Sequence, residues 1–416
     1  MTTPRHVAVV GGSLAGLRSA EQLRALGHTG PITVFSAERH LPYNRPPLSK
    51  EALGEFDSAT AEELAGRLAF RRRASIADVD IRLATPVATA DLRAHRLTLD
   101  SGAEQAYDAL VIATGLRPRR LVAPGPARGR HVLRTVEDCL GLRAALRPGS
   151  RAVVIGGGFI GCEVAGTLRT LGHDVTVVEP AGPPMQRVLG SDLAAAVQAH
   201  LTASGIEFVI GTGVVSFTGD DAVTGVELAT GETLRADIVV EAIGSVCNVE
   251  WLYGQGLDLS DGVLTDNRLA VAGVSDTVAV GDLARFPNPL FDDVPRRVEH
   301  WSIPGDTANR AAATLLGPHH NDAPFAPVPA FWSNQLDLRL QSYGSPALAD
   351  AAHLEEGNVD DLTGGVILTY HRDHRHVGTV AVNLSPARLR ETPRCFHRRP
   401  AARMTTSAQN NNEVIR

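Results

Sequence analysis

Short, mostly apolar runs are spaced along the chain, and each one precedes a turn or a segment of helical periodicity. Such runs cover residues 7–10, 32–35, 107–112, 153–155, 175–178, 237–243 and 278–280. Strands buried on both faces read as unbroken apolar runs, which is typical of parallel sheets covered by helices. Residues 81–99 instead alternate between apolar and polar positions, as an antiparallel unit does. The pattern predicts an α/β fold.

A glycine motif after one of these runs predicts a dinucleotide site, although a purely structural turn is the alternative. Gly156, Gly158 and Gly161 have the G-x-G-x-x-G spacing between a strand and a helical segment. Such glycines allow a tight turn, close approach to a pyrophosphate and close helix packing. Glu179, eighteen residues after Gly161, ends the next strand, where a carboxylate accepts hydrogen bonds from ribose hydroxyls. The predicted nucleotide-binding residues here are Gly156, Gly158, Phe159, Ile160, Gly161 and Glu179.

The N-terminal run leads into a second motif of this kind, about 145 residues earlier in the chain. Its predicted binding residues are Gly11, Ser13, Leu14, Ala15, Gly16 and, near the end of the following strand, Glu38. Ser13 takes the place of the middle glycine. A serine in ordinary dihedrals still lets the backbone approach a phosphate, and its hydroxyl can add a hydrogen bond; the alternative is a structural turn only. Two such motifs predict two dinucleotides, with tightly bound FAD at the first and mobile NADH at the second.

Turn-rich connectors predict how the chain divides. A proline-rich connector over residues 117–126 follows the strand that ends in Ala113, Thr114 and Gly115, and a second boundary falls near Gly244. We predict a flavin domain of residues 1–115 and 245–323, with a nicotinamide domain of residues 116–244 inserted into it. Residues 324–400 form a third domain, and the polar residues 401–416 form a flexible tail. The predicted fold class is α/β, with two Rossmann-like domains and a smaller α+β C-terminal domain.

Two further segments carry candidate chemistry. The loop LPYNRPPLSK, residues 41–50, is stiffened by three prolines and presents Arg45 and Lys50 close to the first motif. Cations held against a cofactor are one interpretation, and an ordinary solvated loop is the other. The strand at 278–280 ends in Gly281 and Asp282, where a carboxylate can reach the ribityl hydroxyls of a flavin.

Composition narrows the range of functions. The chain has 416 residues, a formal charge of −6 and no apolar run as long as a membrane span, so neither nucleic acid nor membrane is an expected partner. No secretory signal precedes the first strand, and the four cysteines form no C-x-x-C pair. These features favour a cytoplasmic protein without a metal site. His371, His374 and His376 are interpreted as surface residues of a hairpin turn.

Several separate motifs give the chain its family resemblance, from about Val7 to Arg390. They are GGSLAGLRSAEQLR, PYNRPPLSK, YDALVIATG, VVIGGGFIGCEVA, VAVGDLARFPN, VEHW and FWSNQ. With these motifs the chain resembles the FAD-dependent, NADH-using ferredoxin reductases of cytochrome P450 and dioxygenase systems, the putidaredoxin and rubredoxin reductase group. Related disulfide and peroxide reductases carry cysteine in the segment that reads PYNRPPLSK here.

The resemblance implies roles for particular residues. Arg45 and Lys50 are expected to contact the isoalloxazine, and Glu163 to lie near the nicotinamide and pair with Lys50. Lys50 and Glu163 are thus the predicted catalytic residues. Glu38 is expected at the FAD ribose and Asp282 at the ribityl chain. Trp301 is expected to back the flavin and Trp332 to stand at its exposed edge. The remaining predicted cofactor contacts are Ala113, Thr114, Gly115, Gly244, Gly281, Glu299 and His300.

The implied reaction takes hydride from NADH onto FAD and passes single electrons to a [2Fe-2S] ferredoxin or similar carrier. That carrier in turn feeds a cytochrome P450 or a dioxygenase, and the reductase is expected to be a monomer or homodimer. Pro183, Ala242 and Cys247 depart from the family pattern. Two alternatives are a flavin peroxide or disulfide reductase, and an NADH-sensing flavoprotein similar to apoptosis-inducing factor. The missing cysteines argue against the first, and the lack of targeting and basic segments against the second.

Overall fold

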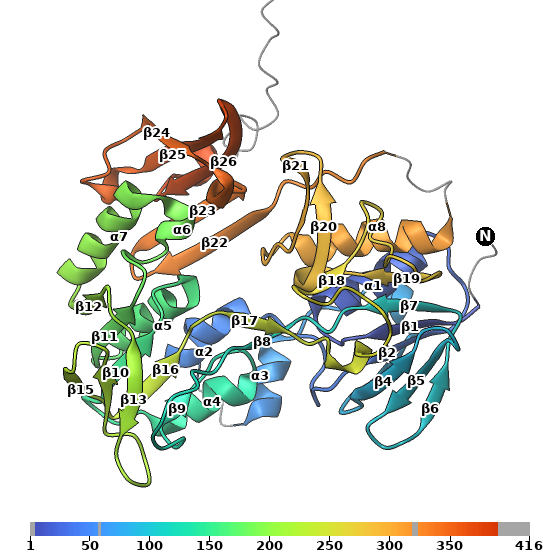
Figure 1. Ribbon diagram of the computed structural model, residues 1–416, viewed down its shortest axis with the longest axis horizontal. Helices are drawn as coiled ribbons and strands as arrows, with labels where there is room; N and C mark the ends of the chain where they lie inside the picture. Colours follow the sequence, from blue (N-terminus) through green and yellow to red (C-terminus); the bar gives the residue numbers. More distant parts are fainter. Residues whose placement is uncertain (1–4, 57–59, 318–322, 390–416) are drawn as a thin grey trace, which may run out of the picture.

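The computed structural model describes residues 5–56, 60–317 and 323–389 (Figure 1). Its first sheet has five parallel strands in the order β19-β7-β1-β2-β3. These strands are β1 (Val7–Val10), β2 (Ile32–Phe35), β3 (Asp80–Arg82), β7 (Ala109–Ile112) and β19 (Thr277–Ala279). Because β19 pairs with β7, chain segments more than 160 residues apart complete one sheet.

Helices and a small antiparallel sheet cover this first sheet. Helices α1 (Leu14–Ala25) and α8 (Ile303–Leu316) pack against each other beside it, as Figure 1 shows. The antiparallel sheet contains β4 (Val87–Asp91), β5 (Arg96–Leu99) and β6 (Glu104–Ala106) and shares the same hydrophobic core. A three-stranded sheet of β18 (Val263–Leu264), β20 (Ala284–Asn288) and β21 (Asp292–Arg296) lies nearby.

The second parallel sheet has the strand order β12-β11-β10-β16-β9. Its strands are β9 (Arg130–His131), β10 (Arg151–Ile155), β11 (Asp174–Glu179), β12 (Ile206–Ile210) and β16 (Ile238–Glu241). Successive side chains of β10 point to opposite faces, so Val154 packs in one core and Val153 and Ile155 in another. Helices α4 (Val136–Ala145), α5 (Phe159–Thr170) and α7 (Ser191–Ala203) contribute to the core that contains Val154. Strands β13 (Val214–Thr218), β14 (Gly225–Leu228) and β15 (Thr233–Arg235) cover the other face.

Two adjacent connecting strands join the two parallel sheets. Strand β8 (Leu116–Pro118) leads into the second sheet, and β17 (Ser245–Cys247) leads back out of it. They pair with each other in antiparallel fashion, with Leu116 opposite Cys247. The side chain of Arg117 adds hydrogen bonds to the carbonyl of Cys247 and to Asn248. The chain therefore enters and leaves the second sheet through one short ribbon.

The third sheet is antiparallel, in the order β22-β23-β26-β25-β24. Its strands are β22 (Ala330–Gln335), β23 (Leu338–Gly344), β24 (Ala351–Glu356), β25 (Val366–Arg372) and β26 (Arg375–Val382), followed by the short helix α9 (Pro386–Leu389). In Figure 1 it lies over α6 (Gln186–Leu189) and α7. The Tyr370 hydroxyl donates to the carbonyl of Leu189 at 2.6 Å, and the two units share one hydrophobic core.

The stretch that begins in the proline loop, residues 41–50, belongs to this shared core as well. It forms a 3-10 turn, η1 (Pro46–Ser49), and helices α2 (Glu51–Gly54) and α3 (Ala61–Leu68). Apolar side chains from these elements pack with those of α4 and α5. The loop of residues 41–50 is therefore packed against the unit that carries the second glycine motif.

The predicted fold class is confirmed: two parallel α/β sheets carry the two glycine motifs, and a smaller unit follows them. The domain boundaries stay a prediction, and the predicted flexible tail, residues 401–416, lies outside the described residues. Among the helices of the described residues, none is long and apolar enough to cross a membrane.

Candidate functional site

The first glycine turn is shaped by close backbone contacts. Gly11 has a φ of +121°, and a Cβ there would lie 2.0 Å from the carbonyl oxygen of Ala113. A Cβ on Gly16 would lie 1.9 Å from the carbonyl oxygen of Gly11, so this glycine lets α1 start directly above the turn. Ser13 is extended, with φ −100° and ψ −159°, which any residue adopts. A serine is therefore compatible with the middle position, and Leu14 and Ala15 begin the helix whose N-terminus faces the turn.

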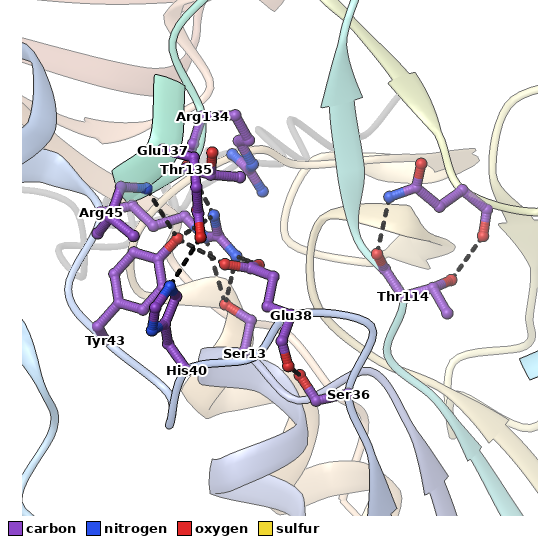
Figure 2. Close-up of polar contacts among 12 residues, drawn as sticks. Ser13, Ser36, Glu38, His40, Tyr43, Arg45, Thr114, Arg134, Thr135 and Glu137 are labelled. Carbon is purple, nitrogen blue, oxygen red and sulfur yellow. Dashed lines mark hydrogen bonds and ion pairs between the residues drawn. The ribbon is translucent and has the colours of Figure 1, made fainter. Parts of the chain in front are cut away.

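A cluster of charges forms around Ser13 (Figure 2). The Arg45 guanidinium pairs with the Glu38 carboxylate and approaches the Ser13 hydroxyl at 3.4 Å. Tyr43 donates its hydroxyl hydrogen to the other Glu38 oxygen at 2.6 Å, and burial raises the pKa of Tyr43 above its ordinary value. Arg45 also donates to the backbone carbonyl of Arg134 at 2.6 Å.

Asp282 lies close to this cluster through Arg134. The nearest guanidinium nitrogen of Arg134 is 3.6 Å from a carboxylate oxygen of Asp282. Burial raises the pKa of Asp282, and the neighbouring Arg134 charge opposes the rise. The Nε of Arg134 is buried without a hydrogen-bond partner among the described residues. Next to a glycine turn and a helix N-terminus, this donor fits an anionic dinucleotide.

Residues that follow β7 and β19 in the same sheet are also held by hydrogen bonds. The Thr114 hydroxyl donates to the carbonyl of Asn248 at 2.6 Å, and the Asn248 amide donates back to the carbonyl of Thr114 at 3.0 Å (Figure 2). Gly115 and Gly281 have φ values of +61° and +73°. The amide of Gly281 donates to the Thr307 hydroxyl at 2.9 Å, which ties this strand end to α8.

The second glycine turn repeats the first. A Cβ on Gly156 would lie 2.5 Å from the carbonyl oxygen of Ala242, and one on Gly161 would lie 2.1 Å from the carbonyl oxygen of Gly156. A Cβ on Gly158 would meet no atom within 4 Å, so the backbone at the start of α5 is open to close approach. The two Glu179 oxygens accept from the amides of residues 157 and 181 at 2.7 and 2.9 Å. The carboxylate is thus held at the mouth of the turn.

Lys50 and Glu163 bring the two nucleotide units together. Lys50 Nζ is 2.6 Å from Glu163 Oε2, and only 14% and 8% of the two side chains is exposed. The Ser49 hydroxyl donates to the same carboxylate oxygen at 2.6 Å. The pairing that the resemblance implied is present. Arg45 and Lys50, however, lie on either side of the η1 turn and contact different groups, so the shared isoalloxazine contact stays a prediction for both.

Aromatic side chains gather where β22 passes the start of α8. The rings of Trp301 and Trp332 are 5.5 Å apart and edge to face, and Trp332 is 40% exposed. Phe331, beside Trp332, packs against His300 at 4.7 Å and against Phe159 at 4.6 Å. Burial lowers the pKa of His300 to about 4, so this imidazole is neutral at physiological pH.

Glu299 and Gly244 lie next to the connecting ribbon. The Glu299 carboxylate accepts from the Ser245 hydroxyl at 3.0 Å and pairs with Arg297 at 2.8 Å. Gly244 precedes β17 with a φ of +93°, and its carbonyl accepts from the Arg119 amide at 2.9 Å. The predicted binding role of Glu299 remains a prediction.

Other residues of the site were not among those predicted from the sequence. Tyr43, Arg134, Ser49 and Ser333 contact predicted site residues, and Gln335 contacts Ser333, yet none of the five belongs to a glycine motif. The histidines of the third sheet do contact one another, since the rings of His371 and His376 lie 5.5 Å apart. Within the described residues, no group of three or more metal-ligating side chains is placed to hold an ion.

Comparison with known proteins decides the family. The model of the pyridine nucleotide-disulphide oxidoreductases matches residues 5–306. The chain belongs to this family. Membership implies a flavin and a nicotinamide nucleotide as the redox groups. The resemblance to the ferredoxin reductases is confirmed by individual relatives.

Individual relatives show which members of this family the chain is similar to. The ferredoxin reductase component of chlorobenzene dioxygenase from Cupriavidus sp. (strain PS12) is 36% identical, over 91% of this chain and 89% of that one. The rubredoxin-NAD(+) reductase of Ectopseudomonas oleovorans is 33% identical, over 91% and 96%. Among solved structures, the ferredoxin reductase for the CYP199A2 system from Rhodopseudomonas palustris has a TM-score of 0.85, at 31% identity and 93% coverage of both chains.

Proposed function

We propose that the chain is an NADH-dependent ferredoxin reductase: it takes electrons from NADH through FAD to a [2Fe-2S] ferredoxin that feeds a cytochrome P450 or a dioxygenase. The observation that carries the proposal is the buried Lys50–Glu163 pair. Lys50 comes from the loop beside the first glycine turn, and Glu163 comes from the beginning of α5, the helix that follows the second glycine turn. The pair thus lies where the reacting ends of two dinucleotides, one in each unit, would meet.

Residues of the first unit fit FAD. Gly11 and Ser13 offer backbone and hydroxyl donors to the pyrophosphate, and Glu38 offers a carboxylate to the ribose. Arg45 and Arg134 supply positive charge beside the turn, and Asp282 supplies an acceptor for the ribityl hydroxyls. When bound, a flavin supplies the chemistry of accepting a hydride and releasing its electrons one at a time.

Residues of the second unit and the loop position the donor. The open backbone at Gly158 and the held carboxylate of Glu179 bind NADH at its pyrophosphate and adenosine ribose. Lys50 places a positive charge near the reacting rings, where negative charge accumulates. Hydride transfer between two well-positioned rings depends on proximity, so no side chain of the site is required as a general acid or base.

Trp332 marks the proposed exit for electrons. It is 40% exposed and packs edge to face against Trp301, whose proposed role is to back the flavin. Dioxygenase systems appear in the names of several relatives, and one solved neighbour is a covalent complex of putidaredoxin reductase with putidaredoxin. A small iron–sulfur protein docking over this face is the partner that we propose. Location in the cytoplasm stays a prediction from the cysteine pattern.

One assay tests the proposed function. FAD-loaded protein is mixed with NADH, cytochrome c and each candidate [2Fe-2S] ferredoxin in turn, and cytochrome c reduction is followed. We expect a rate that depends on the ferredoxin and saturates with its concentration. A peroxide-dependent oxidation of NADH instead would indicate the peroxide reductase alternative. A long-lived NADH charge-transfer complex that passes electrons to none of the ferredoxins would indicate the NADH-sensing flavoprotein.

Glu179 is expected to make the enzyme selective for NADH. A carboxylate fixed by two amides repels a 2′-phosphate, and such repulsion lowers kcat/KM for NADPH by roughly 10²-fold relative to NADH. Glu179→Ala should reduce this ratio to about tenfold or less. Glu207→Ala removes an exposed acid from the next strand and should leave the ratio unchanged. Equal kcat/KM values for the two coenzymes in the wild-type enzyme would contradict the assignment.

A further inference from the structure

A hydrogen-bonded chain of buried side chains runs from Glu163 into the third sheet. The Ser333 hydroxyl donates to Glu163 Oε1 at 2.6 Å, while Lys50 and Ser49 occupy Oε2. Glu163, Ser333 and Gln335 are 7%, 1% and 0% exposed. The carboxylate is therefore held by donors on both oxygens, and one of them comes from a residue 170 positions away.

The direction of each bond in the chain is fixed by its chemistry. A carboxylate only accepts, so the Ser333 hydroxyl must donate to it. The lone pairs of that hydroxyl then accept from the Gln335 amide nitrogen at 3.2 Å. The same amide nitrogen lies 3.1 Å from Met185 Sδ. If the Glu163 oxygen that faces Ser333 rotated away, the buried Ser333 hydroxyl would lose the acceptor for its hydrogen.

The chain also reaches the turn that holds Glu179. Met185 has a left-handed backbone, with φ +59°, and its amide donates to the carbonyl of Gly157 at 2.9 Å. The amide of Gly157 in turn donates to Glu179. Strand β22 thus contacts both ends of the second nucleotide unit, through Ser333 at one end and through Gln335 and Met185 at the other.

Packing keeps β22 in place against α5. A Cβ on Gly166 would come within 3.3 Å of the backbone nitrogen of Leu336, so this glycine lets the turn after β22 approach the helix closely. At the same turn, Asp337 pairs with His200 of α7 at 2.7 Å. Along β22, Ser333 and Gln335 point inward, whereas Trp332 and Asn334 are exposed.

We propose that Ser333 and Gln335 are positioning residues, through which the C-terminal sheet holds the Glu163 carboxylate and the Gly157 turn in the geometry that NADH requires. This proposal rests on the proposed function, because it takes Glu163 to lie at the nicotinamide. The third sheet then has a part in the reaction in addition to any docking surface. The exposed face of β22 carries Trp332, and its buried face carries the two residues that position the nicotinamide site.

Ser333→Ala tests the proposal, and Ser342→Ala is its matched control. Ser342 is equally buried on the next strand of the same sheet, and its hydroxyl has no hydrogen-bond partner among the described residues. We expect Ser333→Ala to lower the limiting rate of flavin reduction by about tenfold, with less than about a threefold change in the Kd for NADH. Ser333→Thr keeps the hydroxyl and should restore most of the rate.

A measurement on the unloaded protein complements the kinetics. Deuterium uptake of the peptide that covers the start of α5 should rise in Ser333→Ala and stay at the wild-type level in Ser342→Ala. Gln335→Leu, which removes the contact with Met185, should weaken NAD⁺ binding in calorimetry by about tenfold. If Ser333→Ala matches Ser342→Ala in both rate and uptake, the positioning role is wrong. If the wild-type protein itself binds no NAD⁺, the proposed function is wrong instead.

Discussion

Replacing Lys50 with methionine should lower the limiting rate of flavin reduction by NADH by roughly 10²-fold, the usual effect of removing one preorganised charge from a reacting centre. Lys50 is the cation of a nearly buried pair, held by Glu163 at 2.6 Å and by the carbonyl of Pro46 at 3.2 Å. Methionine keeps the length of the side chain but leaves the Glu163 charge uncompensated. NADH binding itself should change less, because most of its contacts lie at the glycine turn and Glu179.

Stopped-flow mixing with increasing NADH separates the two effects, since the limiting rate and the apparent Kd come from the same titration. Removing one partner of a buried pair also costs about 3–5 kcal/mol of stability, so the melting temperature should be measured in parallel. The Lys50→Met/Glu163→Gln double variant removes both charges and should recover stability without recovering the rate. A limiting rate in Lys50→Met equal to that of the wild-type enzyme would remove Lys50 from the mechanism.

Arg45→Leu should weaken FAD binding by roughly 10²-fold, because it breaks the centre of the first charge cluster. Arg45 contacts Glu38, Tyr43, the Ser13 hydroxyl and the Arg134 carbonyl. Without the guanidinium, the Glu38 carboxylate and the Arg134 carbonyl lose a donor, and Ser13 loses the charge beside it. One substitution therefore disturbs both Ser13, which we propose contacts the pyrophosphate, and Glu38, which we propose contacts the adenosine ribose.

The FAD dissociation constant is best measured by titrating apoprotein with FAD and following the quenching of flavin fluorescence. Arg96→Leu provides the control: Arg96 pairs with Glu104 on the surface of β5 and β6, where both side chains are about half exposed. Exposed pairs contribute only about 0–1 kcal/mol, so FAD binding should be unchanged in this variant. An Arg45→Leu protein that retains wild-type affinity would show that the cluster does not hold the cofactor.

Local patterns were sufficient to predict most strands of the two parallel sheets and both glycine turns. Mostly apolar runs predicted β1, β2, β7, β10 and β11, because a strand covered on both faces by other elements places most of its side chains in a hydrophobic core. The spacing of Gly156 and Gly161 predicted the turn before α5, where a Cβ at either position would collide with backbone. Glu179 was predicted from its distance along the same unit, since strand, helix and strand have standard lengths.

The partners of these residues were not predictable in the same way. Arg134 is 89 residues from Arg45, and no property of an arginine ahead of a helix cap distinguishes it from other arginines in the sequence. Ser333 lies in the FWSNQ segment, in which Trp332 was the only predicted site residue. Its inward direction follows from strand pairing with β23, which a single segment does not encode.

The two glycine turns, the family motifs and the lack of cysteine in the loop at residues 41–50 can all be recognised from the sequence, because each depends on residues that are neighbours along the chain. The separation of Arg45 and Lys50 into different clusters, and the contact from the third sheet to Glu163, became visible only in the folded chain. Both have one cause. A buried charge must find its counter-charge and its donors from whatever elements pack around it, and that packing is set by the whole fold.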